Sequence, residues 1–246
     1  MKSRLLIGIC VYNEGNKLKK VLDNLVKFEI EDNIEYGVII ANDGSTDKTS
    51  EICNEYCKKY KWTYIEHKEN KGIGYTLKEM IHYGIDNHYD VFTALPGNNK
   101  VRVKDIKKFY LPVINENYDY VKGSRYMKGG NCDNLPTFRK IAIPIYSFLI
   151  SSTMKTKITD ITCLVNALKL NIFKKYNINI DQDWLDKYEL EYYILYYILK
   201  KELKFKETPI QAKYPKSKSN YTKIKPFVGW WSMIRPWVLL KFGIKK

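Results

Sequence analysis

The chain has 246 residues, of which 45% are hydrophobic and 14% aromatic, and this globular composition excludes an intrinsically disordered protein. Its 42 Lys and Arg residues outnumber its 27 Asp and Glu residues and give a formal net charge of +15, which favours an anionic partner: a nucleic acid, an acidic membrane surface or a phosphate-bearing ligand. The five cysteines form no CxxC pair, so the sequence argues against a zinc site or a disulfide framework and favours a reducing cytoplasm.

The first part of the chain alternates apolar strands with amphipathic helices. Continuous apolar runs predict buried strands at residues 5–11, 36–41, 62–66 and 89–96. Apolar side chains recur at helical spacing in the intervening residues 18–26, 49–60 and 73–85. Ser45 or Thr46 is expected to cap the second of these helices. This alternation predicts an α/β fold with a parallel sheet and right-handed crossovers.

The second part of the chain is less regular. We expect a strand at residues 118–123, a helix at 137–155 kinked by Pro144, a helix around 190–198 and a late strand at 203–212. No internal repeat or low-complexity linker divides the chain, so we expect one catalytic domain over residues 1–212 and a basic, Trp-rich extension over 213–246. No apolar run is long enough for a signal peptide or a membrane span.

Polar segments follow three of the predicted strands. Ligands of parallel sheets bind outside the carboxyl ends of the strands. Residues 12–14, 42–47 and 96–100 are therefore expected to lie along one rim and to form a single site.

Several motifs along the chain are similar to those of a known enzyme family. They are VYNEG (residues 11–15), NDGSTDKT (42–49), NKGIGYTLKEMIHYG (70–84), VKGSRY (121–126) and ETPIQAKYPKSKS (207–219). The chain resembles the family 2 glycosyltransferases, and among them the polyprenyl-phosphate hexosyltransferases. The resemblance implies a GT-A nucleotide-sugar-binding fold with a mostly parallel central sheet and helices on both faces. It also implies inverting transfer of a hexose from a nucleoside diphosphate-sugar to a polyprenyl phosphate or a lipid-linked acceptor.

The resemblance assigns donor nucleotide binding to Tyr12, Glu14 and Asp43. Asn42 departs from the paired aspartates that are usual in the family, while Asp43 keeps the second position. Two ordinary structural roles stay open: Asp43 can serve as a turn or cap residue, and Glu14 can be a first-turn acid that the helix dipole favours.

The segment PGNNKV (residues 96–101) differs from the family at the metal site. Relatives carry an aspartate here that binds Mg²⁺ or Mn²⁺ at the donor diphosphate, and the match puts Asn98 at that position and Lys100 nearby. An amide oxygen can coordinate a hard cation but supplies no charge, whereas Lys100 can offset charge on the leaving diphosphate. An ordinary turn with a solvated lysine is the alternative, so the sequence leaves metal dependence open.

The resemblance assigns phosphate or acceptor binding to Arg125, Arg139 and Lys218. Arginine suits this role because its planar fork binds phosphate oxygens bidentately. The alternatives are surface charges for the two arginines and a disordered segment around Lys218.

Asp160 matches an aspartate that precedes a Ser-Gly-Phe-Arg segment in relatives, although this chain has CLVNALK there. Asp160 could orient the acceptor, act as a base or help hold a metal. A lipid phosphate is already ionised near neutral pH and needs no strong base. A saccharide hydroxyl does need one, so a transferase acting on such a hydroxyl is the second hypothesis.

The C-terminal residues 226–246 pair Trp230, Trp231, Trp237 and Phe242 with cationic side chains. This composition favours contact with an anionic membrane surface, and we expect a peripheral enzyme on the cytoplasmic membrane face. A docked helix or an oligomer contact is the alternative. A catalytically inactive subunit that binds nucleotide or lipid is the third hypothesis. No recognisable nucleic-acid-binding motif is present, so we expect no nucleic-acid partner.

Overall fold

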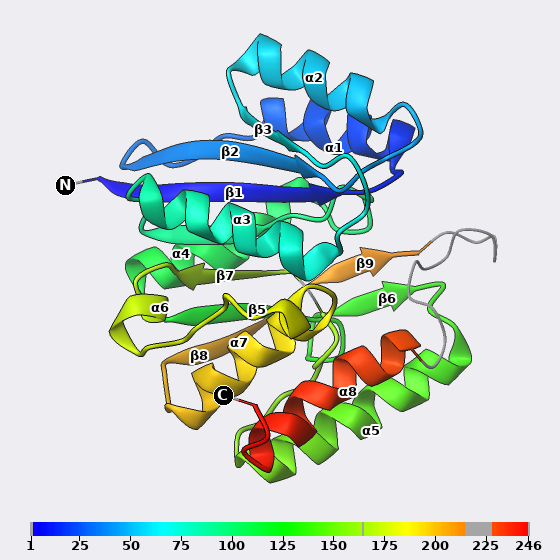
Figure 1. Cartoon of the computed structure of the whole chain (residues 1–246), viewed down its shortest axis with the longest axis vertical. Coiled ribbons are helices and arrows are strands. Elements are labelled where there is room, and N and C mark those ends of the chain that lie inside the picture. Colours follow the sequence, from blue (N-terminus) through cyan, green and yellow to red (C-terminus); the bar gives the residue numbers. More distant parts are fainter. Residues whose placement is uncertain (1, 164, 215–227, 246) are drawn as a thin grey trace.

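The computed structural model describes residues 2–163, 165–214 and 228–245. Seven strands form one central sheet in the order β3-β2-β1-β4-β7-β5-β8 (Figure 1). Their bounds are β1 Ser3–Val11, β2 Ile34–Asn42, β3 Thr63–Glu66, β4 Val91–Ala94, β5 Tyr120–Ser124, β7 Asn166–Lys169 and β8 Phe205–Pro209.

The central sheet is mostly parallel, as the alternation of elements predicts. Strands β1 to β4 pair in parallel, and β5 pairs in parallel with β8. Strand β7 lies between β4 and β5 and is antiparallel to both. The α/β class with a mostly parallel sheet is therefore confirmed.

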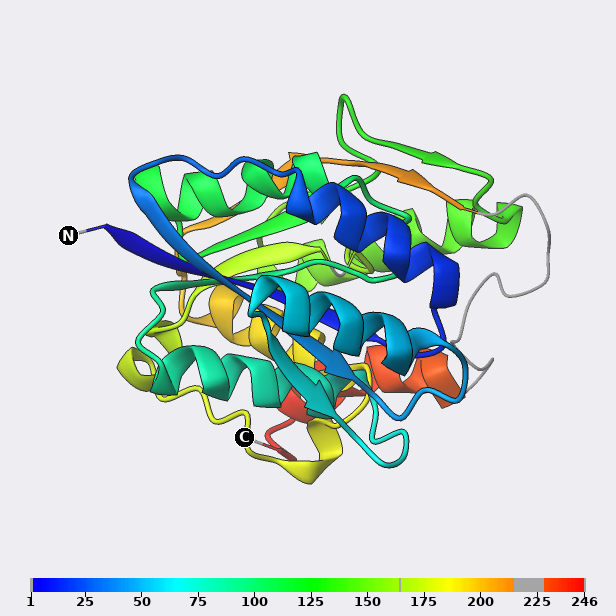
Figure 2. The same cartoon turned by 90° about the horizontal axis from the view of Figure 1, so that it is seen from above.

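Helices cover both faces of the sheet. Helices α1 (Gly15–Val26), α2 (Thr49–Tyr60) and α4 (Lys107–Asn115) contribute to one hydrophobic cluster, and α3 (Ile73–Asp86) and α7 (Glu189–Lys200) contribute to the other. Figure 2 shows α1 and α4 on one side of the sheet and α3 on the other. Side chains of β1 alternate between the two clusters, which is why its sequence is a continuous apolar run.

A smaller layer adjoins the end of the sheet. Strand β6 (Asn131–Asp133) pairs in parallel with β9 (Gln211–Lys213). The predicted strand at residues 203–212 was therefore wrong in one respect, because β8 and β9 belong to different sheets. The described residues also form the short helix α6 (Ile172–Lys175) and 3₁₀ turns at Val103–Ile106 and Asp183–Leu185. The proposed division of the chain after residue 212 stays a prediction.

Helices α5 (Thr137–Met154) and α8 (Val228–Lys241) lie side by side next to this layer (Figure 1). The hydroxyl of Tyr146 on α5 donates to the Met233 carbonyl oxygen on α8, at 2.8 Å. On its other side α8 packs against α7, and Trp237 is only 5% exposed there. In the described part of the chain, no helix combines the length and the apolar character that a membrane crossing requires.

Candidate active site

The segments after β1, β2 and β4 lie at one edge of the sheet. The backbone N–H of Asp43 donates to the Val11 carbonyl oxygen at the end of β1, at 2.9 Å. The backbone N–H of Leu95 donates to the Gly8 carbonyl oxygen, also at 2.9 Å. The rim predicted from the strand order is thus confirmed, and it brings together the segments that carry the motifs.

The loops after β1 and β2 are held together by side-chain hydrogen bonds. Ser45 Oγ accepts from the Asn13 N–H at 2.9 Å, and Asn13 Oδ1 accepts from the Thr46 N–H at 2.7 Å. Asn13 has φ of +50°, a conformation that asparagine tolerates better than most residues. The predicted cap at Ser45 or Thr46 was wrong, because α2 begins at Thr49 and Asp47 Oδ1 accepts from the Thr49 N–H. Ser45 and Thr46 join the two loops instead.

Tyr12 and Glu14 are half-buried in the first of these loops. Thr49 Oγ1 accepts from the Glu14 N–H at 2.9 Å, which fixes the backbone of the loop against α2. The Glu14 carboxylate lies 3.6 Å from Lys17 Nζ. Glu14 directly precedes α1, so the dipole-related role stays open beside nucleotide binding.

Asp43 anchors the loop that leads into α3. Its Oδ1 accepts from the Lys71 N–H at 2.8 Å and its Oδ2 from the Gly72 N–H at 3.0 Å. His67 Nδ1 lies 2.9 Å from Oδ1, and His67 Nε2 contacts Glu79 on α3. Asp43 is only 5% exposed. The carboxylate therefore positions the rim backbone, and its predicted contact with a donor nucleotide stays a prediction.

The structure gives a physical reason for asparagine at position 42. Its amide Nδ2 donates to Ser50 Oγ at 2.7 Å and to Glu66 Oε1 at 3.1 Å, while Oδ1 accepts from the Ser45 N–H at 3.2 Å. An aspartate could not donate to Ser50 or Glu66, and its charge would face the Glu66 carboxylate. The departure from the paired aspartates is therefore matched to its surroundings.

The PGNNKV segment forms a tight turn at the rim. Asn98 Oδ1 accepts from the Lys100 N–H at 3.1 Å, an Asx-type turn. Lys100 Nζ lies 4.9 Å from the centre of the Tyr214 ring. Among the described residues, no group of three or more His, Cys, Asp or Glu side chains could hold a metal ion. This donor set, an amide with a nearby lysine, fits a hard divalent cation poorly because Mg²⁺ sites ordinarily include one or two carboxylates.

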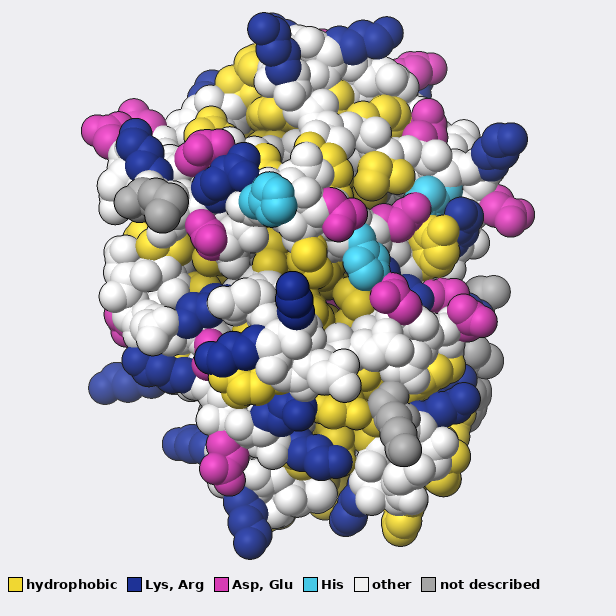
Figure 3. All heavy atoms as spheres, turned by 60° about the vertical axis from the view of Figure 1, so that its left-hand side comes forward, with side chains coloured by type: hydrophobic (Ala, Val, Ile, Leu, Met, Phe, Trp, Pro, Cys, Tyr) yellow, Lys and Arg dark blue, Asp and Glu magenta, His cyan; other side chains and the backbone are white. Residues whose placement is uncertain are grey.

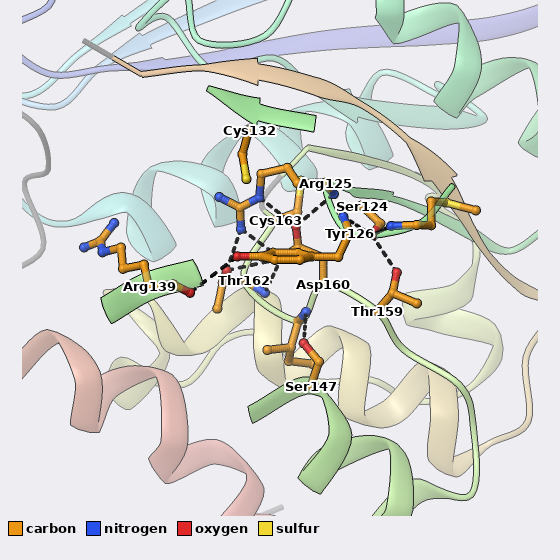
Figure 4. Close-up of polar contacts among 12 residues, drawn as sticks. Ser124, Arg125, Tyr126, Cys132, Arg139, Ser147, Thr159, Asp160, Thr162 and Cys163 are labelled. Carbon is orange, nitrogen blue, oxygen red and sulfur yellow. Dashed lines mark hydrogen bonds and ion pairs between the residues drawn. The ribbon is translucent and has the colours of Figure 1, made fainter. Parts of the chain in front are cut away.

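Arg125 and Asp160 form a buried ion pair (Figure 4). Arg125 Nε donates to Asp160 Oδ2 at 2.6 Å and Nη2 donates to Oδ1 at 2.8 Å, while the Arg125 backbone N–H donates to Oδ2 at 3.0 Å. Asp160 is fully buried and Arg125 is 7% exposed. Burial alone would raise the pKa of Asp160, but the hydrogen bonds and charge of Arg125 outweigh it and hold that pKa below its ordinary value.

This pairing bears on the roles predicted for both residues. A carboxylate with a lowered pKa is a weak base, and Asp160 has no surface that an acceptor hydroxyl could reach. The guanidinium group of Arg125 is directed to Asp160 and to the hydroxyl groups of Thr162 and Tyr214. The geometry favours a structural role for the pair. Catalysis by Asp160 and phosphate binding by Arg125 stay predictions.

Arg139 and Lys218 are the two remaining residues predicted to bind the acceptor phosphate. Arg139 lies in the first turn of α5, where its carbonyl oxygen accepts from the Tyr126 hydroxyl at 3.4 Å. Its side chain extends away from the Arg125–Asp160 pair in Figure 4. Lys218 lies outside the described residues.

Glu191 on α7 is a candidate acid–base residue that the sequence analysis did not identify. Burial raises its pKa to about 8, although the charge of Lys122 opposes the shift. Asn166 Nδ2 lies 3.5 Å from Glu191 Oε1, and Asn166 pairs with Ala94, the last residue of β4. Glu191 therefore sits close to the strand end that leads into PGNNKV. The available signal was a single acid inside the apolar run of residues 190–199.

Comparisons with known proteins agree with this geometry. The family model described as Glycosyl transferase family 2 matches residues 6–177. The chain is 25% identical over 219 residues to the UDP-N-acetylglucosamine–dolichyl-phosphate N-acetylglucosaminyltransferase of Methanococcus voltae, and the match covers 84% of each chain. It is 28% identical over 161 residues to the dolichol-phosphate mannosyltransferase of Pyrococcus furiosus, a match that covers 64% of this chain and 43% of that one.

Two solved structures show the same fold. The mannosyl-3-phosphoglycerate synthase of Rubrobacter xylanophilus superposes with a TM-score of 0.70 at 11% identity, over 99% of this chain and 76% of that one. The mannosyltransferase PcManGT of Pyrobaculum calidifontis, solved with GDP-Man and Mn²⁺, superposes with a TM-score of 0.57 at 13% identity, over 90% of this chain and 59% of that one. The GT-A fold expected from the motifs is thereby confirmed.

Proposed function

Because the chain belongs to glycosyl transferase family 2, we propose that it transfers a hexose from a nucleoside diphosphate-sugar to a polyprenyl phosphate or a lipid-linked acceptor. The observation that carries this proposal is the similarity to a dolichyl-phosphate glycosyltransferase over 84% of both chains. The rim loops support it, because they bring the motif residues of three strands to one edge of the sheet.

The donor nucleotide is proposed to bind over the loops after β1 and β2, in contact with Tyr12, Glu14 and Asp43. The support is structural: Asp43 fixes the backbone of Lys71 and Gly72, and the hydrogen bonds between the two loops hold this edge in one arrangement. A preorganised rim of this kind lowers the cost of ordering the site when a ligand binds.

The leaving diphosphate is proposed to lie beside the PGNNKV turn. Lys100 would then balance the charge that develops as the glycosidic bond breaks. A Mg²⁺ or Mn²⁺ ion, if the enzyme uses one, would supply the same charge stabilisation from near Asn98. Mn²⁺ accompanies GDP-Man in the PcManGT structure. The residues of this turn are nevertheless better suited to direct charge balance by lysine than to holding a metal.

The acceptor phosphate is proposed to attack the anomeric carbon in line, opposite the leaving diphosphate, which inverts the configuration. Its oxygen is ionised near neutral pH, so positioning and charge balance supply the catalysis without a strong base. Arg139 and Lys218 are proposed to hold this phosphate. Arg125 and Asp160 would shape the acceptor side as a pair. Because a polyprenyl phosphate is a membrane lipid, we also propose that the enzyme acts peripherally, at the cytoplasmic membrane face.

The test is transfer by the pure protein. It is incubated with labelled UDP- and GDP-sugars and a short polyprenyl phosphate in detergent, with Mg²⁺ or with EDTA. We expect labelled lipid, and Lys100→Met should reduce it strongly while the exposed variant Lys104→Met does not. Labelled lipid only with Mg²⁺ would support a metal near Asn98. Turnover without labelled lipid would contradict the acceptor, and no turnover of any donor would favour an inactive binding subunit.

A second candidate function is transfer to a saccharide hydroxyl, and Glu191 is the observation that favours it. Its raised pKa of about 8 suits a general base near neutral pH far better than the lowered pKa of Asp160 does. In this case Glu191→Gln should abolish transfer to saccharide acceptors. The same substitution should leave transfer to a polyprenyl phosphate within a few-fold of the wild type, because an ionised acceptor needs no base.

A further inference from the structure

One face of α5 exposes a row of large apolar side chains. Residues spaced three, four and one apart along the helix point to solvent, and each is at least 56% exposed: Phe138, Ile141, Ile145, Phe148 and Leu149. The opposite face of α5 is buried, through Ile143, Ser147 and Ile150. The exposed row, called the α5 outer face below, is therefore an apolar surface that the described part of the chain leaves largely exposed.

Helix α8 extends this apolar surface. It lies beside α5, where the rings of Phe138 and Trp230 are 5.4 Å apart, and it exposes Trp231 and Ile234. The C-terminal residues Phe242 and Ile244 are more than 60% exposed. Several large exposed apolar side chains on adjoining elements exceed the scattered ones that are normal for a monomer, and they indicate an interaction surface.

The charges around this surface identify its partner. Residues 137–159 and 228–245 contain no Asp or Glu. Cationic side chains stand at both ends of the α5 outer face, Arg139 and Lys140 at one end and Lys155 and Lys157 at the other. On the face shown in Figure 3, acidic side chains lie mainly in the upper half, while lysine and arginine continue to the lower end, the end at which Figure 1 shows α5 and α8. A second copy of the chain would set like charges against each other, whereas an anionic bilayer would match them.

We propose that the α5 outer face, with the exposed residues of α8, is the surface by which this protein docks on an anionic lipid bilayer. The apolar side chains enter the headgroup boundary and the flanking cations contact lipid phosphates. This inference rests on the proposed function, because an enzyme with a lipid acceptor has to reach a membrane. It also indicates the side from which the lipid acceptor would enter the site. Helix α5 begins at Thr137, close to the loop after β5, so a polyprenyl phosphate would enter the site from the N-terminal end of α5.

The surface differs from the one expected from the C-terminal sequence. Trp237 is buried against α7, where its ring lies 5.8 Å from that of Tyr196. It therefore cannot be a membrane anchor while α8 is docked. Five of the exposed apolar side chains lie on α5 instead, a helix for which the sequence predicted only a kink at Pro144.

The test is sedimentation of the full chain with vesicles of phosphatidylcholine, alone or with about 30% phosphatidylglycerol. We expect binding to the anionic vesicles that weakens as salt rises. The double variant Ile145→Ser, Phe148→Ser should bind about tenfold or more weakly, and Lys155→Glu with Lys157→Glu should remove the preference for phosphatidylglycerol. The matched control, Tyr36→Ser with Val26→Ser, removes exposed apolar side chains from α1 and β2 and should bind like the wild type.

Equal binding of the two apolar double variants would overturn the proposal. So would a dimer that the Ile145→Ser, Phe148→Ser variant dissociates, together with no vesicle binding, because it would identify a second copy as the partner. Sugar transfer to a detergent-dispersed polyprenyl phosphate separates this proposal from the proposed function. Transfer without vesicle binding would refute the docking surface alone, and vesicle binding without any transfer would refute the proposed function alone.

Discussion

At the scale of single residues, the acids near the rim differ in what surrounds them. Asp43 accepts backbone hydrogen bonds from Lys71 and Gly72. Asp160 accepts a bidentate arginine, which holds its pKa below the ordinary value. Glu191 is half-buried, and desolvation raises its pKa to about 8 because the charge of Lys122 opposes the shift only in part. Asp160, which the family resemblance selected, is thus a weak base because its pKa is lowered. Glu191, whose pKa is raised, belongs to none of the family motifs.

The first prediction concerns the Arg125–Asp160 pair. Asp160→Asn leaves a buried guanidinium without its counter-charge, and we expect the free energy of unfolding to fall by about 3–5 kcal/mol. Urea denaturation measures this loss, with the exposed Asp86→Asn as the control. Arg125→Met combined with Asp160→Leu should recover much of the stability, because the pair is replaced by apolar groups. An unchanged stability with lost activity would instead support a direct catalytic role for Asp160.

The second prediction concerns the pH dependence of stability. An unfolded glutamate ionises near 4.5, whereas Glu191 in the folded protein keeps its proton to about pH 8. Between these values the unfolded chain binds fewer protons, so stability should fall as pH rises, by at most about 1.4 kcal/mol per pH unit. Glu191→Gln should remove this component of the slope in urea denaturation at pH 5.5 and 7.5. Parallel curves for variant and wild type would mean that Glu191 ionises normally.

At the scale of elements, the C-terminal helix is held by both apolar and ionic contacts. Trp237 and Leu240 of α8 are each 5% exposed in the core cluster that α7 shares. Arg235 Nη2 lies 2.7 Å from Glu189 Oε1 on α7, and Glu189 is only 1% exposed. Helix α8 is therefore part of the packed structure over its buried face, and only its other face is available for a partner.

The third prediction compares two tryptophans of α8. Trp237→Ala removes a buried ring and should reduce the free energy of unfolding by about 3–5 kcal/mol. Trp231→Ala makes the same chemical change at a position that is 54% exposed, so its effect should stay within about 0.5 kcal/mol. Thermal and urea denaturation of both variants provide the comparison. Similar losses at the two positions would mean that α8 is not docked as described.

At the scale of the whole molecule, the first and the second half of the sequence both contribute strands to one central sheet. Strand β7 is inserted between β4 and β5, and residues from β1 to α8 contribute to the same core cluster. A cut after residue 212 would pass through β9, which pairs with β6. These connections couple the proposed catalytic domain to the proposed extension.

The fourth prediction is that the chain unfolds in one cooperative transition. Both hydrophobic clusters of the described core contain residues from the first and from the second half of the sequence. The calorimetric and van't Hoff enthalpies of unfolding should therefore agree. Differential scanning calorimetry measures both. A separate low-temperature transition that Trp237→Ala removes would show that the C-terminal extension folds as a unit of its own.

The sequence by itself determined the strand–helix order and the rim. A continuous apolar run of strand length, such as that of β1, favours a strand covered on both faces, and neighbouring parallel strands present their carboxyl ends at the same edge. The family motifs are also local in the chain, and three of them, at residues 11–15, 42–49 and 121–126, lie at strand ends. The local pattern was a weaker guide at the ends of elements. It placed the α2 cap at Ser45 or Thr46, but the Ser45 side chain and the Thr46 backbone N–H instead bond to Asn13 in the loop after β1.

Only the tertiary structure decided what each polar side chain does. The pairing of Arg125 with Asp160 joins residues 35 positions apart, and the pKa of Glu191 depends on burial by distant strands. Trp237 and Phe148 look alike in sequence, yet one is buried and the other is 68% exposed. Burial and ion pairing arise from contacts between segments remote in the chain, so the sequence could indicate the family and the rim but not the chemistry of individual groups.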